Sequence, residues 1–151
     1  MSKSKWGPIV WNMIHCLTLK IKPNFFEQEK GNILMMLNNI CTNLPCPICS
    51  VHASQYIRKN KMHLVKTKQE LVAFIFNMHN DVNKRLKRKL ASKDVLKTYE
   101  QIKFADVCND FFRIIFMGVR NNRMIMHSMH KEIASNKIYK ILKGTLYKYV
   151  N

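Results

Sequence analysis

Glycine and proline are both scarce in this sequence of 151 residues, with only four of each, and no proline lies beyond Pro47. Because proline interrupts helices and both residues mark turns, this scarcity argues against a turn-rich β fold and favours long helices. Acidic residues are scarce too: 9 Asp and Glu stand against 26 Lys and Arg, a formal charge of +17. Such a balance attracts nucleic acid, anionic lipid or an anionic cofactor, although a solvated surface position explains most single lysines.

The sequence also lacks a long apolar run. The longest candidate, residues 111–119, contains Arg113 and is much shorter than the roughly 18 residues that a membrane-spanning helix needs. The basic start of the chain is followed by Trp6-Gly7-Pro8 instead of the apolar core of a secretory signal. We therefore expect no membrane span and a cytoplasmic protein.

Apolar residues recur at helical spacing along most of the chain. The pattern predicts four helices, which we expect to form an antiparallel bundle, over about 9–19, 25–41, 46–58 and 71–86. Pro8 is the expected start signal of the first helix. Ser92 or Asp94 is then expected to cap a further helix that ends near Gly118. Two weaker helical segments follow, at about 122–135 and 137–149.

Cys46-Pro47-Ile48-Cys49 is the first motif that carries chemistry. Two cysteines three positions apart at a helix start can form a disulfide, and the positive end of the helix dipole stabilises a thiolate there. Zinc is the main competing interpretation, because Cys41 and His52 lie close enough in the sequence to complete a four-ligand set. However, no second CxxC or HxxxH motif exists, and paired clusters are usual in structural zinc sites. A purely structural cysteine pair is the other alternative.

The second motif lies in the predicted fourth helix, where His79, Asn83 and Leu86 share one face. An aromatic ring, an amide and an aliphatic side chain in a row can stack on, hydrogen-bond to and support a planar heterocycle. The alternative is a bundle helix that simply buries a histidine and an asparagine. Near the start of the chain, Trp11 and His15 are spaced in the same way and also share a face.

Together these segments resemble the Erv/ALR family of FAD-linked sulfhydryl oxidases, and most of all its short viral members. The resemblance runs in order from Trp6 to about Tyr99. It implies an all-α fold, a four-helix bundle around FAD with a short fifth helix, to which this chain adds a C-terminal helical extension. The corresponding division is an oxidase domain over 1–100 and an extension of unknown role over 101–151. Family members usually form homodimers.

The resemblance also implies a function and its residues. The protein would form disulfides in a dithiol protein, such as a thioredoxin-like or small CxxC relay protein, and pass electrons to FAD and then to oxygen. A viral setting would place this activity in virion assembly, in the host cytoplasm and the virion. Cys46 and Cys49 would be catalytic, with Cys49 facing the flavin and Cys46 exchanging with the substrate, and no metal is expected. The residues expected to bind FAD are Gly7, Trp11, His15, His52, Phe74, His79, Asn80, Val82, Asn83, Leu86, Arg88 and Lys89.

The sequence departs from the family pattern in places. Pro8 and Leu19 stand where many members have a basic residue and a tyrosine, Phe74 replaces an expected tryptophan, and Arg88 replaces a lysine. A CxxC pair that staples the C-terminal segment of cellular members is missing. The phosphate contacts are therefore the least defined part of the predicted site.

Other functional classes remain to be weighed. A basic helical nucleic-acid-binding protein would explain the charge and the run over 84–89, but not the CxxC motif or the His79 face. A zinc-stabilised interaction module would explain the cysteines alone. A thioredoxin-like oxidoreductase needs a βαβ pattern, which is not visible. Cys16, Cys41 and Cys108 are expected to be buried thiols, with Cys108 as a candidate shuttle or subunit-linking cysteine.

Overall fold

The computed structural model describes residues 2–118 and 125–151, with side chains described for 2–114 and 129–151. The prediction of an all-α fold is confirmed, since the regular elements of these residues are helices and their only β feature is an isolated bridge. The α-helices are α1 (Lys3–Leu19), α2 (Phe26–Thr42), α3 (Pro47–Lys59), α4 (Lys68–Arg85), α5 (Val95–Gln101), α6 (Phe104–Gly118) and α7 (Ile125–Thr145). Short 3₁₀ turns lie at Pro23–Phe25, Met62–Leu64 and Leu146–Lys148.

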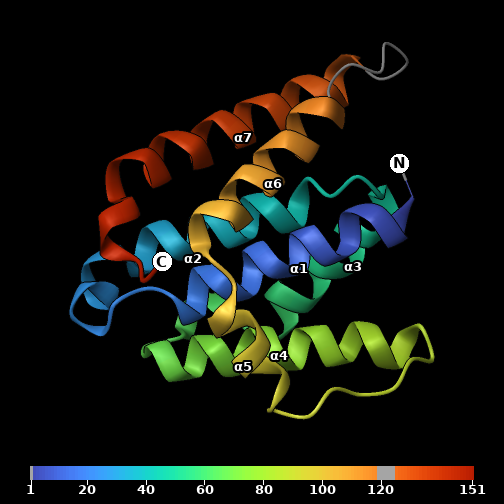
Figure 1. Cartoon of the computed structure of the whole chain (residues 1–151). Coiled ribbons are helices and arrows are strands. Elements are labelled where there is room, and N and C mark those ends of the chain that lie inside the picture. Colours follow the sequence, from blue (N-terminus) through green and yellow to red (C-terminus); the bar gives the residue numbers. More distant parts are fainter. Residues whose placement is uncertain (1, 119–124) are drawn as a thin grey trace.

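Helix α1 is the centre of the molecule (Figure 1). It packs against α2, α4, α5 and α6, so that α4 and α5 lie on one side of it and α6 and α7 on the other. Met13, Cys16 and Leu17 of α1 are completely buried in a core to which every α-helix contributes. Full burial of each large apolar side chain contributes about 1.5–3 kcal/mol, so this core fixes the position of α1 relative to α3 and α4.

The first helix begins earlier than the sequence predicts. It starts at Lys3, with Ser2 in the N-cap position, and Pro8 lies inside it instead of marking its start. A proline this close to a helix N-terminus interrupts few hydrogen bonds, since the first four N–H groups have no partner within the helix in any case. The extra turns matter because they carry Lys3, Trp6 and Gly7, which prove to be part of the candidate site.

Helices α2, α3 and α4 lie where the sequence predicts them, within a few residues. Asn43 ends α2, and α3 starts at the CxxC motif with Cys46 as its N-cap. A capping box of Thr67 and Glu70 begins α4, in which each side chain accepts a hydrogen bond from the other's backbone N–H.

The predicted single helix after Ser92 is wrong. Ile102 has an extended backbone and separates α5 from α6. Asp94 makes no capping bond and instead pairs with Lys97 at 3.3 Å. The two weaker segments predicted beyond Gly118 form one helix, α7, up to Thr145, because nothing in the sequence between 135 and 137 stops a helix. The predicted end of the second segment is instead a 3₁₀ turn at Leu146–Lys148, and residues 122–124 of the prediction lie outside the described residues.

After α7 the chain returns to the far end of α1. Residues 146–150, here called the C-terminal strap, form a bridge between Tyr149 and Ile21 and a hydrogen bond of 2.7 Å from the N–H of Val150 to the carbonyl of Lys20. The buried Nζ of Lys148 lies 2.6 Å from Oε1 of Glu29 on α2. The strap thus ties the extension to α1 and α2. In the part of the chain described, no helix combines the length and apolarity needed to cross a membrane.

Candidate functional site: a cavity beside a disulfide

A cavity of about 510 Å³ opens between the start of α1, the start of α3, the end of α4 and Tyr99 of α5. This volume falls in the range of small-molecule and cofactor sites. Its wall contains aromatic and aliphatic side chains from all four helices, among them Trp6, Trp11, Met78 and Val82. The packing of α3 and α4 around the N-terminal half of α1 therefore creates a largely apolar chamber.

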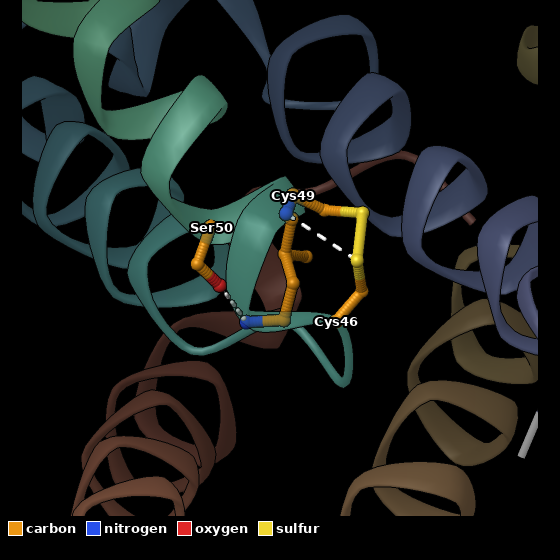
Figure 2. The surroundings of a disulfide bond; sticks show 4 residues. Cys46, Cys49 and Ser50 are labelled. Carbon is orange, nitrogen blue, oxygen red and sulfur yellow. Dashed lines mark hydrogen bonds between the residues drawn. A yellow bond between two sulfur atoms is a disulfide. The ribbon is translucent and has the colours of Figure 1, made fainter.

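One residue of the cavity wall, Cys49, belongs to a disulfide. Cys46 and Cys49 are joined, with their Cα atoms 5.2 Å apart, at the first turn of α3 (Figure 2). The Sγ of Cys46 also accepts a hydrogen bond of 3.3 Å from the N–H of Cys49. The loop that leads into the motif is held by Ser50, whose Oγ accepts the N–H of Leu44 at 2.9 Å (Figure 2). The helix N-terminus and this hydrogen bond both favour a thiolate once the disulfide is reduced.

The two cysteines have different surroundings. Cys49 lines the cavity, whereas Cys46 does not. Both are half-buried, and Cys46 lies beside the exposed Pro47 and Ile48. Cys49 is therefore the cysteine of the pair that lies on the cavity, and Cys46 lies next to the exposed residues that follow it.

Aromatic rings from three helices stack beside the cavity. The rings of Trp11 and His79 are parallel within 7° at a centroid separation of 3.8 Å, and His15 stacks on Tyr99 at 4.1 Å. Nε2 of His15 lies 3.0 Å from Nδ1 of His79 and connects the two stacked pairs.

Both histidines in this stack are neutral at physiological pH. Burial and the neighbouring His79 lower the pKa of His15 to about 3, and burial with the nearby Arg88 lowers the pKa of His79 to about 4. Nδ1 of His15 is buried and has no hydrogen-bond partner among the described residues. Because a buried N–H without an acceptor is rarer than a bare acceptor, the favoured tautomer puts the hydrogen on Nε2 of His15 and leaves His79 a free N–H.

The rim of the cavity is cationic. Lys3, Arg85 and Arg88 line it, and no acidic residue does. None of these three side chains makes a hydrogen bond or ion pair within the described part of the chain. Arg88 is placed by the end of α4, where Lys87 adopts a left-handed φ of 54° and the N–H of Arg88 donates to the carbonyl of Asn83 at 2.8 Å. This is a Schellman ending with lysine at the position that glycine usually takes.

The structure brings part of the predicted cofactor set together. The predicted residues that line the cavity are Gly7, Trp11, His52, His79, Val82, Leu86 and Arg88, with Cys49 beside them. His15 lies behind His79, and Phe74 instead packs edge-on against Tyr56 at 5.5 Å. Lys89 is exposed in the loop that follows α4.

Two predicted amides have other partners. Asn80 donates to the carbonyl of Ala91 and accepts its N–H at 2.9 Å, so it fastens the loop between α4 and α5. Asn83 donates to Asn80 at 3.3 Å. Both amides shape the cavity indirectly, since this loop carries Arg88. Their direct contact with a cofactor stays a prediction.

Several lining residues were not selected from the sequence. Trp6 and Lys3 require the early start of α1, and Tyr99 requires the fold that returns α5 to α1. Arg85 had a detectable signal, since it precedes Arg88 by three positions and both lie in the basic run that could have indicated nucleic acid.

The remaining cysteines lie in the core. Burial raises the pKa of Cys16 to about 11 and those of Cys41 and Cys108 to about 12. The expectation of buried free thiols is confirmed for all three. Within the residues described, no group of three or more His, Cys, Asp or Glu is arranged to hold a metal ion.

The sequence model of the Erv1/Alr family matches residues 8–104. The chain belongs to this family. It is 34% identical over 99 residues to an FAD-linked sulfhydryl oxidase of African swine fever virus, a match that covers 64% of this chain and 81% of the relative. The homologue from another isolate of that virus is 33% identical over 97 residues, with the same coverage. The mitochondrial FAD-linked sulfhydryl oxidase of Saccharomyces cerevisiae is 30% identical over 82 residues, or 54% of this chain and 43% of the yeast protein. No solved structure matches the chain.

The Erv1/Alr match covers α1 from Pro8 onward together with α3, α4 and α5, and it ends at the first residue of α6. Lys3, Trp6 and Gly7, which also line the cavity, lie before its start. Helices α6 and α7 and the C-terminal strap thus lie outside it, although they share one core with α1.

Proposed function

We propose that the protein is an FAD-linked sulfhydryl oxidase that forms disulfide bonds in dithiol substrates. The observation that carries the proposal is the disulfide at the start of α3, which has one cysteine on a cavity of cofactor size and the other outside it, beside the exposed Pro47 and Ile48. Membership of the Erv1/Alr family supports the same function, and the named relatives are FAD-linked sulfhydryl oxidases.

The residues of the cavity fit FAD in chemistry. A flavin or adenine ring needs flat apolar walls, which the tryptophans and aliphatic side chains of α1 and α4 supply. A diphosphate needs cations, and Lys3, Arg85 and Arg88 lie on the rim without any other ion-pair partner among the described residues. Gly7 lines the cavity, and a methyl group at its Cα would meet no atom within 4 Å, so the backbone of α1 is open to close approach by a cofactor.

The chain's own residues can carry out the first half of the reaction. A substrate thiolate attacks Sγ of Cys46, and the electron pair of the broken S–S bond leaves on Sγ of Cys49. A second substrate thiolate then attacks the substrate sulfur of the mixed disulfide and releases the Cys46 thiolate. The substrate now holds a disulfide, and both active-site cysteines are reduced. The helix dipole stabilises the thiolates formed at these two positions.

The second half restores the active-site disulfide. FAD, when bound, accepts the electron pair of the two cysteines and passes it to molecular oxygen, which becomes hydrogen peroxide. We assign this transfer to Cys49, and its position in the cavity wall supports the assignment. The neutral His79 adds an N–H donor there. Overall, two thiols and one oxygen molecule give one disulfide and one hydrogen peroxide.

The proposal includes finer points that rest on the family resemblance. They are a protein substrate of the thioredoxin-like or small CxxC relay type, a homodimer, an oxidase domain over 1–100 with an added extension, and a role in virion assembly in the host cytoplasm. Viral relatives support the last point.

The test is the visible absorption spectrum of the purified protein, before and after denaturation, together with oxygen consumption on dithiothreitol. A flavin spectrum that is released on denaturation, with one hydrogen peroxide formed per dithiol, is the expected result. A colourless protein that neither takes up added FAD nor consumes oxygen would overturn the proposal.

A further inference from the structure

We propose, on the basis of the oxidase function above, that the substrate reaches Cys46 as an extended segment in which apolar residues follow the reactive cysteine and an acidic residue lies about five positions away. The segment would lie along the exposed face of α3. This assigns a docking surface and a substrate class to the exposed face of α3, of which Ile48 also lines the cavity while Val51 and Lys59 do not.

The surface begins with two apolar side chains that are largely exposed to solvent. Ile48 is 60% exposed and Val51 is 50% exposed, and they lie one turn apart on the same face of α3. Both are adjacent to the half-buried disulfide at the start of the helix. A substrate whose thiol attacks Cys46 from the outer side therefore meets these two side chains first.

The same face ends in a cation. Gln55 and Lys59 continue the spacing of Ile48 and Val51 by further helical turns, and both are exposed. Lys59 lies in the last turn of α3, next to Arg58. From Cys46 to Lys59 the helix rises roughly 20 Å, which an extended peptide spans with about six residues. Because helical side chains tilt toward the N-terminus, the ammonium group of Lys59 can reach a residue about five positions from the attacking cysteine.

The charges around this surface favour an acidic partner. Across residues 1–69 the acidic side chains are Glu27 and Glu29, both in the first turn of α2. The rest of α2 separates them from the disulfide loop by roughly 22 Å along the helix axis. Asp81 of α4 does act on α3, but through Tyr56, which packs toward α4 and Phe74. The exposed face of α3 therefore carries cations without neighbouring anions on its own helix.

The extension adds a further positive charge near the disulfide loop. Lys131 of α7 lies with Asn39 and Asn43 at the end of α2, three residues before Cys46. Opposite charges at an interface accelerate association and select partners more than they raise affinity. Apolar contact at Ile48 and Val51, followed by charge pairing at Lys59, is thus a selection mechanism for thiol segments.

The experiment compares two reduced CxxC peptides, identical except that glutamate or lysine stands five positions from the attacking cysteine. The glutamate peptide is expected to have a kcat/KM at least about tenfold higher at low ionic strength, and added salt should reduce this ratio. Dithiothreitol, which is small and neutral, calibrates the activity of each preparation. Equal kcat/KM for the two peptides, with normal turnover of dithiothreitol, would overturn this proposal and leave the oxidase function intact.

Two variants locate the effect on α3. Lys59→Gln is expected to remove most of the difference between the peptides, and Val51→Asp to lower kcat/KM for the glutamate peptide several-fold, while neither changes turnover of dithiothreitol. Leu64→Asp is the matched control, since Leu64 is 58% exposed but follows α3 instead of lying on it. A Leu64→Asp effect as large as that of Val51→Asp would mean that overall charge, and not the α3 surface, determines the preference.

Discussion

At the two ends of α1 the same kind of side chain, a lysine or an arginine, meets very different surroundings. At the C-terminal end each cation has an acceptor: Nζ of Lys20 donates to the carbonyl of Glu100, Nζ of Lys22 to that of Tyr147, and Nζ of Lys148 to Glu29. At the N-terminal end, Lys3 and Arg88 line the cavity, and their side chains make no hydrogen bond or ion pair within the described residues. The difference separates the cations that hold the fold together from those that are available to a ligand.

The largest effect is expected from substitution of the disulfide beside the cavity. Cys46→Ser and Cys49→Ser should each lower kcat by at least about 10³-fold, because the pair acts as a unit, and the double variant should be no worse than either single one. The structure predicts that FAD remains bound in all of them, since the cavity keeps its other walls. Stopped-flow turnover and the flavin spectrum measure both quantities.

A variant at the C-terminal end of α1 should leave turnover nearly unchanged. Lys22→Gln, which alters a half-buried cation hydrogen-bonded to the C-terminal strap, is expected to leave kcat within about twofold of the unchanged protein. A large loss of turnover in Lys22→Gln would mean that the cations at the C-terminal end of α1 also affect catalysis, and would contradict the separation of structural from ligand-binding cations.

Breaking the buried ion pair of Lys148 and Glu29 should lower stability and leave catalysis unchanged. Lys148→Met leaves the carboxylate of Glu29 buried without its cation, so the melting temperature should fall clearly while turnover at 25 °C persists. Thermal unfolding followed by circular dichroism measures the change. Lys143→Met, which removes an exposed lysine from the last turn of α7, is the matched control.

The same pair gives a pH dependence whose sign can be worked out. Burial opposes ionisation of Glu29, but hydrogen bonds from Asn32 and Lys148 lower its pKa below the ordinary 4.5. Its hydrogen bond to Glu29 raises the pKa of Lys148 above 10.5. The pair therefore stabilises the fold fully between about pH 4.5 and 10.5, and loses this contribution in more acidic or more basic solution. Glu29→Gln should flatten the acid limb of the stability curve; an unchanged limb would assign acid unfolding to other groups.

The sequence predicted the region around the disulfide and the cavity better than the region around the C-terminal strap, for a physical reason. The CxxC motif and the His79 helix are local patterns, and helical periodicity alone places Cys49 at a helix start and His79 on a buried face. Tyr99 and the C-terminal strap depend instead on contacts between segments more than 80 positions apart, such as His15 with Tyr99 and Glu29 with Lys148. No local spacing encodes such contacts.

The error at the start of α1 has a similar origin. Pro8 is a typical start signal, yet Trp6 packs into the core and α1 begins before the proline. Tertiary contacts overruled the local propensity there. The hydrogen bonds of Asn80 and Asn83 to each other and to the loop at Ala91 likewise could not be seen in the sequence, and the contact of these amides with a cofactor stays a prediction.

Substitution of two glycines, one at the cavity and one away from it, should give a smaller effect on FAD binding. Gly7→Ala and Gly31→Ala both replace a helical glycine whose new methyl meets no atom within 4 Å, so each should stabilise the protein by ~0.5–1 kcal/mol. Only Gly7 lines the cavity, and only Gly7→Ala should therefore weaken FAD binding, by about tenfold. Fluorescence titration of the apoprotein with FAD measures the affinity. Equal affinities in the two variants would place the cofactor away from the start of α1.

The smallest effect concerns the two lysines with left-handed backbones. Lys61 has φ of 53° after α3 and Lys87 has φ of 54° after α4, where a side chain with a Cβ is strained by roughly 1 kcal/mol. Lys61→Gly and Lys87→Gly should thus each raise the free energy of unfolding by about that amount, measured by urea denaturation.

The two variants should differ in their affinity for FAD, because Lys87 directly precedes Arg88 and fixes its direction at the cavity rim. A glycine there loosens the turn, so Lys87→Gly should weaken FAD about twofold and Lys61→Gly not at all. If both variants gain stability and bind FAD with equal affinity, the left-handed turn at Lys87 affects only the stability of the fold. The position of Arg88 at the cavity would then not depend on that turn.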